Sequence, residues 1–448
     1  MLKRLVASIA AGAVAVAAMA VPARAQERLS LIRDTEVEAI IRTMATPLWK
    51  AAGLQPGAVR ILLVNDRSLN AFVAQGQNLF INTGLLIRAD SAGQVMGVIA
   101  HETGHMAGGH LARLPEAYRN AIYTSLLAVA LGVAGAMAGG GGNAGAAAIT
   151  GGASLAQRSF FAFTRSQEQS ADQAGVGYLE QTGQSARGML QFMEIIQHKE
   201  VLSAIQQDPY LRTHPMTSER IDFLRNQVAR SRYSDAPVPP ELEKLHKRMR
   251  AKLAAFIDPP GRTLDTVPAS DTSLDARYAR AIAYYRIPDL KAALPLIDGL
   301  IQEFPKDPYF LELRGQMLFE NGRIADALPS YREAVALMPS AALIRIDLAH
   351  VQLETNDPVL LAEAESNLTA AARTEPDLPD LWRLLAVAYG RGGQIGMAAM
   401  ALAEQALLEG RRLDARDQAR RAMRLLPTGS PGWLKAQDAE SQALRERE

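Results

Sequence analysis

The chain has 448 residues, of which 48% are hydrophobic and 21% are charged, and its formal net charge is +1. A chain of this length and composition has room for two or three folded domains and is not a disordered protein. The near-zero net charge gives nucleic-acid binding no support from composition. Cysteine is absent, which excludes disulfides and thiolate nucleophiles and leaves His, Asp and Glu for any metal site.

The first 25 residues, 1–25, have the pattern of a secretory signal peptide. Lys3 and Arg4 precede an apolar run over residues 5–21, and Ala23-Arg24-Ala25 supplies the small residues that a signal peptidase requires. We therefore expect export and cleavage near Ala25–Gln26. An uncleaved membrane anchor is the alternative, which the short, alanine-rich run disfavours.

The next part of the chain predicts a mixture of helices and short strands. Apolar residues at helical spacing alternate here with brief apolar runs that are bounded by turn residues. The predicted elements are a helix over 28–54, strands over 58–64, 69–74 and 78–82, and helices over 91–113, 166–182, 186–198 and 218–231.

Residues 121–156 are almost wholly apolar or small, with a run of four glycines in the middle. This composition predicts a helical hairpin with a glycine tip. The hairpin could be packed on the protein, act as a mobile lid, or touch a membrane at its periphery. Its first half is just long enough to span a bilayer, but the glycine and alanine content disfavours a span.

The last third of the chain repeats. Pro305, Pro339 and Pro376 lie 34 and 37 residues apart, close to the 34-residue period of tetratricopeptide repeats. Small residues recur in register between the prolines, as expected where two helices cross closely. We predict a tetratricopeptide α-solenoid over residues 273–430, with a final half-unit that ends at Pro427. A non-repetitive helical bundle is the alternative.

One motif carries metal chemistry. His101-Glu102-Thr103-Gly104-His105 falls inside a predicted helix, where a spacing of four residues puts both imidazoles on one face. Glu102 lies beside them and can take a proton from water. A chance match on a solvated helix is the alternative, but the preceding strands and the exported, cysteine-free chain favour a metal site.

Catalytic zinc sites need a third protein ligand. His110 is the nearest histidine, but a continued helix would turn it about 140° away from His105, so we expect a structural or outer role. Glu168, on a second predicted helix, is the better candidate. Asp172 shares its face and could accept a hydrogen bond from a ligand imidazole. A solvated helix charge is the alternative for Glu168.

At this point the sequence resembles a family. His-Glu-x-Gly-His at 101–105, Arg165-Ser-Gln-Glu168 and Ala171-Asp172 are similar to the HtpX-like and BepA-like gluzincin metallopeptidases. Asn70-Ala71-Phe72 resembles the strand before the zinc helix in that group. His214-Pro215 followed by Arg220-Ile221, together with a secretory signal and C-terminal repeats, resembles the BepA-like branch.

The resemblance implies one Zn²⁺ per chain, held by His101, His105 and Glu168, with Glu102 as general base. It also implies that His214 can occupy the fourth zinc position and hold the enzyme at rest. Asp172, Arg165 and Arg220 are expected around the ligands, where the arginines could orient Asp172, stabilise an oxyanion or serve as surface charges. One departure is Ser170, where this branch usually has an acidic residue.

We therefore predict a mostly α protein: an α+β gluzincin-type metalloprotease domain with a small β-sheet, then an α-solenoid. The expected boundaries are signal peptide 1–25, metalloprotease domain 26–235, linker with one helix 236–272, repeats 273–430 and C-terminal tail 431–448. An edge strand near residues 70–74 could align an extended substrate by strand addition.

The leading hypothesis is a zinc endopeptidase of the bacterial periplasm. The resemblance implies action on misfolded or misassembled outer-membrane proteins, with the repeats binding the outer-membrane assembly machinery. The alternative is a chaperone or assembly adaptor whose zinc site is latent and capped by His214. A third interpretation is an integral membrane protease held by residues 121–156.

Overall fold

The computed structural model describes residues 30–74, 76–110, 162–202, 214–215 and 217–445. The predicted signal peptide and the apolar hairpin over 121–156 lie outside the described residues. Among the described residues, no helix combines the length and the apolar character that crossing a bilayer would require.

A four-stranded sheet forms near the N-terminus, with β1 (Leu31–Ile32), β2 (Arg60–Val64), β3 (Ala71–Ala74) and β4 (Asn78–Asn82). The order is β1-β2-β4-β3, in which β2 and β4 run parallel and the other two pairs run antiparallel. Strand β3 is therefore at an edge. The three strands predicted from short apolar runs are present, and β1 is an addition where the sequence predicted the start of a helix.

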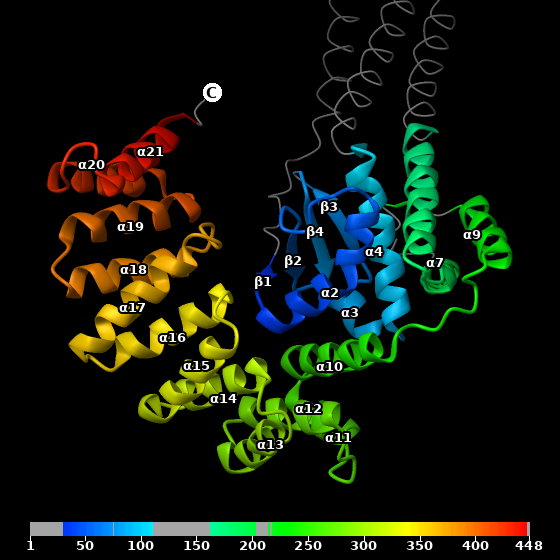
Figure 1. The fold of residues 1–448 in the computed structure, drawn as a ribbon, viewed down its shortest axis with the longest axis horizontal. Coiled ribbons are helices and arrows are strands. Elements are labelled where there is room, and N and C mark those ends of the chain that lie inside the picture. The colour runs from blue at the N-terminus through cyan, green and yellow to red at the C-terminus, as the bar shows by residue number, and fades with distance from the viewer. Residues whose placement is uncertain (1–29, 75, 111–161, 203–213, 216, 446–448) are drawn as a thin grey trace, which may run out of the picture.

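Helices pack around this sheet, and apolar side chains fill the space between them (Figure 1). The first, α2 (Thr35–Ala51), begins at Asp34, whose side chain accepts a hydrogen bond from the Val37 amide. Burial of its apolar face, which includes Trp49, joins it to the sheet. The other helices of this part are α3 (Thr83–Arg88), α4 (Ala92–Ala107), a helix over residues 162–181, α7 (Arg187–Leu202) and α9 (Ser218–Arg230).

Glycines let α4 lie unusually close to its neighbours. A Cβ at Gly97 would lie 2.5 Å from the Cα of Met189 on α7, and a Cβ at Gly188 would lie 2.3 Å from the backbone of Gly93. The two helices thus touch backbone to backbone, which only residues without a side chain allow. This contact fixes α4 in the middle of the domain.

Two helices follow, α10 (Pro240–Ile257) and α11 (Pro260–Thr266). The sequence predicted one helix between residues 236 and 272, so α11 is an addition. The first of the two is not a free linker, because Met249 and Leu253 are buried in the core shared with α2.

The remaining helices form an array of antiparallel pairs that curves beside the first part (Figure 1). The predicted combination of a small sheet and a helical solenoid is confirmed. Gly315 shows why the period needs small residues, since a Cβ there would lie 2.7 Å from the ring of Tyr331 on the paired helix. The array consists of α12 (Leu274–Arg286), α13 (Leu290–Glu303), α14 (Pro308–Glu320), α15 (Ile324–Leu337), α16 (Ala342–Glu354), α17 (Pro358–Ala371), α18 (Pro379–Arg391), α19 (Ile395–Leu408), α20 (Arg412–Leu425) and α21 (Pro431–Arg445).

The C-terminal end differs from the sequence-based expectation. A half-unit ending at Pro427 and a tail over 431–448 were predicted, but α21 packs against α20 and α19 and buries Ala436 and Ala439. The buried face of α21 is rich in alanine and carries no large apolar residues at helical spacing. Hydrophobic periodicity therefore did not predict this helix.

A buried polar network joins the array to the first part of the protein. Glu36, at the start of α2, is fully buried, and its Oε2 accepts a hydrogen bond from Tyr278 Oη at 2.7 Å. Lys252 of α10 places its Nζ 3.1 Å from the same oxygen and 2.7 Å from Asp34. Arg248 also pairs with Glu36 and reaches Asp307 on the array. Each buried charge in this contact has an opposite partner, which offsets the cost of removing it from water. The pairs also fix how the array is oriented relative to the first part.

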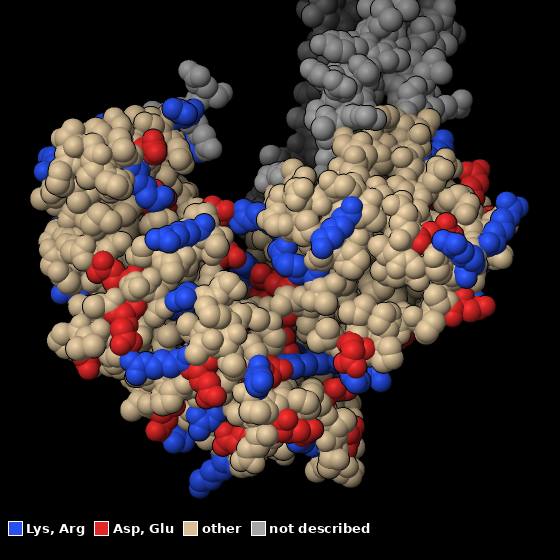
Figure 2. All heavy atoms as spheres, in the orientation of Figure 1, with Lys and Arg blue, Asp and Glu red and all other residues tan. Residues whose placement is uncertain are grey.

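The array touches the first part again at its middle. Arg33, next to β1, makes two 2.7 Å hydrogen bonds to the carboxylate of Glu375. Between the two contacts lies a cavity of about 750 Å³, and Figure 2 shows acidic side chains gathered in this hollow. Burial raises the pKa of Glu312 to about 8 and that of Asp347 to about 7, and both residues line the cavity.

These shifts predict how stability depends on pH. The folded-state pKa of Glu312 exceeds its ordinary value of 4.5, so between about 4.5 and 8 the folded chain holds a proton that the unfolded chain releases. Stability should therefore fall as pH rises through this window. The variant Glu312→Gln keeps an acceptor for the Thr35 hydroxyl but cannot ionise. We expect its melting temperature to fall less than that of the wild type between pH 5 and pH 9.

Exposed Glu333 on α15 provides the matched control. Its Gln variant should follow the wild-type pH dependence. An unchanged pH dependence for Glu312→Gln would contradict the assignment.

Candidate metal centre

Helix α4 positions the His-Glu-x-x-His motif. It begins at Ser91, whose hydroxyl accepts a hydrogen bond from the Gln94 amide, and it ends at Ala107. His101 and His105 lie one turn apart and are both buried. Their Nε2 atoms are 3.1 Å apart, so the two imidazoles point at one place, as the spacing predicted.

The helix over residues 162–181 brings a carboxylate to the same place. Oε1 of Glu168 lies 3.3 Å from His105 Nε2, and Oε2 lies 3.4 Å from His101 Nε2. The approach depends on the glycine of the motif, because a Cβ at Gly104 would lie 2.6 Å from the carbonyl oxygen of Ala171. Backbone contact at this point lets a short side chain such as Glu168 reach both histidines.

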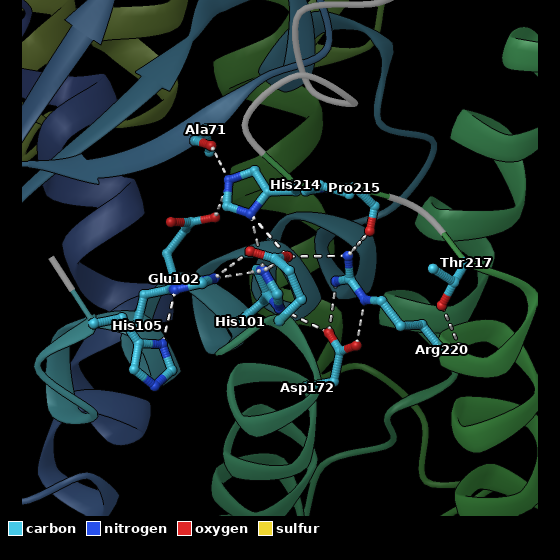
Figure 3. Close-up of polar contacts among 11 residues, drawn as sticks. Ala71, His101, Glu102, His105, Asp172, His214, Pro215, Thr217 and Arg220 are labelled. Atoms are coloured by element: carbon cyan, nitrogen blue, oxygen red, sulfur yellow. Dashed lines mark hydrogen bonds and ion pairs between the residues drawn. The ribbon is translucent and has the colours of Figure 1, made fainter. Parts of the chain in front are cut away.

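A third imidazole comes from the segment before α9. Nδ1 of His214 lies 3.3 Å from His101 Nε2 and 3.1 Å from Glu168 Oε2 (Figure 3). The other ring nitrogen lies 3.3 Å from the carbonyl oxygen of Ala71 on β3, to which it can donate. His214 therefore stands between edge strand β3 and the other three side chains, and it is buried.

The donor set of these four residues fits a metal ion. One atom from each of His101, His105, Glu168 and His214 lies within 4.8 Å of the others. In a tetrahedral site with bonds of about 2.0–2.1 Å, neighbouring ligand atoms are about 3.3 Å apart. Five separations among these residues, 3.1 to 3.4 Å, are close to that value, and all four donor atoms lie within 4.8 Å of one another. This buried set of nitrogens and a carboxylate can hold a metal ion.

Burial tunes the imidazole of His105. Removal from water lowers its pKa to about 3, against the opposing effect of Glu168. This shift favours the neutral ring, which is the form that binds metals. For His101, burial lowers the pKa, but the contacts with Asp172 and Glu168 outweigh it and raise the pKa to about 10.

Glu102 lies beside the cluster with a carboxylate that has no hydrogen-bond partner among the described residues. It is fully buried, and Oε1 is 3.5 Å from His214 Nε2. Burial raises the pKa of Glu102, while His214 and His101 oppose the rise. An unsatisfied buried carboxylate is costly unless a partner arrives, so this group is ready to accept a proton or a hydrogen bond from water.

Outer contacts hold the cluster in place. Asp172, one turn beyond Glu168, puts Oδ1 2.8 Å from His101 Nδ1. Arg220 of α9 donates two hydrogen bonds to Asp172, at 2.6 and 2.9 Å, and lies 3.0 Å from Glu168 Oε2. Burial would raise the pKa of Asp172, but Arg220 and His101 lower it overall. The same Arg220 donates to the carbonyl of Pro215, which ties it to the His214 segment.

Not every residue singled out in the sequence reaches the cluster. Arg165 is exposed and makes no hydrogen bond or ion pair with the described residues of the cluster. The expectation that His110 points away from His105 is wrong, because α4 ends at Ala107 and the chain turns back. A glycine pair directly after the motif, Gly108-Gly109, was the sequence signal that could have revealed this turn.

Comparison with known proteins agrees with the resemblance noted in the sequence. Residues 31–228 match Peptidase family M48. The chain is 25% identical over 387 residues to the beta-barrel assembly-enhancing protease of Yersinia pestis, covering 85% of this chain and 78% of that one. It is 24% identical over 389 residues to the protein of the same name from Escherichia coli strain K12, covering 85% and 77%. The predicted resemblance is confirmed, and the chain carries a metallopeptidase domain.

Solved structures also show partial similarity to this chain. A thermophilic TPR protein from Thermus thermophilus is 21% identical and covers 37% of this chain and 98% of its own, with a TM-score of 0.25. Yeast Tom70 is 14% identical and covers 66% of this chain and 61% of its own, with a TM-score of 0.31. The repeat architecture here rests on the helix pairs themselves.

The close contact between Gly104 and Ala171 predicts what happens when Gly104 is replaced by alanine. In Gly104→Ala the new Cβ meets a backbone oxygen, so the helix over 162–181 must move and carry Glu168 with it. We expect the free energy of unfolding of the metal-free protein to fall by about 1–3 kcal/mol, together with a loss of metal affinity. Urea unfolding and chelator competition measure the two effects.

Gly177, on the helix over 162–181, is the matched control, because a Cβ there would meet nothing within 4 Å. Gly177→Ala should leave metal affinity unchanged and leave stability equal or higher. Equal behaviour of the two variants would show that close contact at Gly104 does not position Glu168.

Proposed function

We propose that the chain is a zinc-dependent endopeptidase of the bacterial periplasm that hydrolyses peptide bonds of misfolded or misassembled outer-membrane proteins. In this proposal one Zn²⁺ is held by His101, His105 and Glu168, Glu102 is the general base, and His214 takes the fourth position at rest. The observation that carries it is the convergence of these donors, within 4.8 Å of one another, beside the buried carboxylate of Glu102, which makes no hydrogen bond with the described residues.

Zinc is the metal that this donor set favours, since imidazole and carboxylate ligands in four-coordinate geometry suit it and cysteine is absent. Zinc in such a site supplies Lewis acidity that polarises a peptide carbonyl and acidifies water. Glu102 then accepts a proton from the attacking water at a carboxylate oxygen and passes it to the leaving amine. Its raised pKa and the lack of hydrogen bonds to its carboxylate among the described residues suit both steps.

Other residues of the chain hold this arrangement. Asp172 receives the Nδ1 side of His101, which orients the ring, and Arg220 fixes Asp172. Strand β3 lies at the edge of the sheet that the described strands form, next to the cluster, where an extended peptide can add by main-chain hydrogen bonding. Ala71 supplies one such carbonyl, which contacts His214 in the present state.

The relatives support the client class and the compartment. Their name ties them to β-barrel assembly, and the sequence-based expectation of an exported chain fits a periplasmic site of action. The helical array supplies a surface for partners, which we assign to the outer-membrane assembly machinery. Residues 121–156 are proposed to contact a membrane peripherally.

The contacts of His214 support a second candidate function. Structural zinc sites are closed by four protein ligands, whereas catalytic sites leave one position open. With His214 in contact with the cluster, the chain could act as a chaperone or assembly adaptor whose zinc site is latent.

Glu102→Gln separates proton transfer from metal binding. Without a base, cleavage of an unfolded client protein should fall by about 10²- to 10⁴-fold, while zinc content stays near one per chain. The measurement is gel-based cleavage by the full-length mature protein alongside metal analysis. Glu180→Gln, on the helix that carries Glu168, serves as the control and should cut normally. A Glu102→Gln variant that cuts at the wild-type rate would rule out the mechanism.

His214→Ala separates a latch from a structural ligand. If His214 only occupies the fourth position at rest, its removal should raise kcat/KM for an unfolded client without lowering the melting temperature much. If it is a structural ligand, the variant should lose zinc and stability and gain no activity. The latter outcome would favour the adaptor.

A further inference from the structure

The chain reverses direction directly after the metal-binding helix. Gly108 closes the helix by donating its amide to the Gly104 carbonyl at 2.9 Å, and Gly109 then adopts a left-handed conformation with φ of 61°. A non-glycine residue rarely takes that conformation. The turn brings His110 back toward the helix, where a continued helix would have carried it away.

The turn places the His110 ring beside the Nδ1 edge of the His105 ring, away from the other candidate ligands. The two Nδ1 atoms are 3.0 Å apart, and the rings meet edge to face with centroids 5.0 Å apart. Both side chains are buried, with 6% of His110 and 7% of His105 exposed. Gly108 leaves the space for this ring, since a Cβ there would lie 2.5 Å from Nε2 of His110.

The chemistry of imidazole decides which way this hydrogen bond runs. Nε2 of His105 faces His101 and Glu168, so Nδ1 is the nitrogen left for an outer contact. A neutral imidazole that binds a metal through Nε2 carries its proton on Nδ1. His105 is therefore the donor, and Nδ1 of His110 is the acceptor.

The two motif histidines then have parallel surroundings. The Asp172 carboxylate lies 2.8 Å from Nδ1 of His101 and pairs with that side of the ring. His105 has an outer acceptor in His110. Partners of this kind fix the tautomer and the ring orientation of a metal ligand, and their loss costs about 10- to 100-fold in metal affinity.

We propose that His110 is a positioning residue of the metal site, which accepts the Nδ1–H of His105 and holds Nε2 toward the other ligands. The proposal rests on the proposed function, because it takes His105 as a ligand. It requires an acceptor at this position and not merely a side chain that fills space.

Two variants of the full-length mature protein separate these roles. His110→Leu keeps an apolar side chain of similar bulk but removes the acceptor. His110→Asn keeps an amide oxygen that can lie near the place of Nδ1. We expect zinc dissociation constants from chelator competition to rise about 10- to 100-fold for the Leu variant and to recover most of the way for the Asn variant.

Two further readouts guard against a purely structural explanation. Visible absorption of the cobalt-loaded protein reports the geometry around the metal, and its bands should change in His110→Leu and be restored in His110→Asn. The melting temperature in excess chelator reports packing alone. Exposed His198, whose Nδ1 contacts the Glu194 carbonyl on its own helix, provides the control, and His198→Leu should bind zinc like the wild type.

The outcomes are distinct. Equal zinc affinity in the wild type and His110→Leu would overturn this proposal alone and leave the proposed function standing. Equal losses in the Leu and Asn variants, with matching losses of metal-free stability, would also overturn it, because packing would then explain the effect. A wild-type chain with no zinc affinity would overturn the proposed function and this proposal with it.

Discussion

The site depends on a backbone contact between two helices. Where α4 crosses the helix over residues 162–181, Gly104 lies against the Ala171 carbonyl with no room for a side chain. This approach sets the distance over which Glu168 must reach the histidines and places Asp172 beside His101. If the two helices crossed at a greater distance, the buried imidazoles and carboxylates would lose contact with one another. Buried polar and charged groups without partners are energetically costly.

Apolar packing and charged contacts have different roles around this helix crossing. Apolar and glycine-mediated packing fixes α4 between α7 and the sheet, so that the motif cannot shift. Charged contacts join segments that are distant in the sequence, such as Arg220 with Asp172 and Lys252 with Glu36. Because Arg220 also holds the Pro215 carbonyl, the same side chain ties the metal site to the His214 segment. The position of that segment and the geometry of the ligands are therefore physically linked.

The helical array is joined to the first part through buried polar groups at one end and the Arg33–Glu375 pair at its middle. A cavity with acidic walls lies between them, so the array presents its inner side toward the first part of the protein (Figure 2).

Local sequence determined most of the elements, the His101–His105 pair and the repeat period, because helical spacing and recurring small residues depend only on neighbours along the chain. It also singled out Glu168 and Asp172, since their spacing puts both on one helix face. It missed β1, α11 and α21. The convergence of Glu168 and His214 on the two histidines, the burial of Glu102 and the return of His110 were decided by tertiary structure. Convergence depends on where helices cross and chains turn, and those positions follow from packing over the whole molecule, which no local pattern encodes.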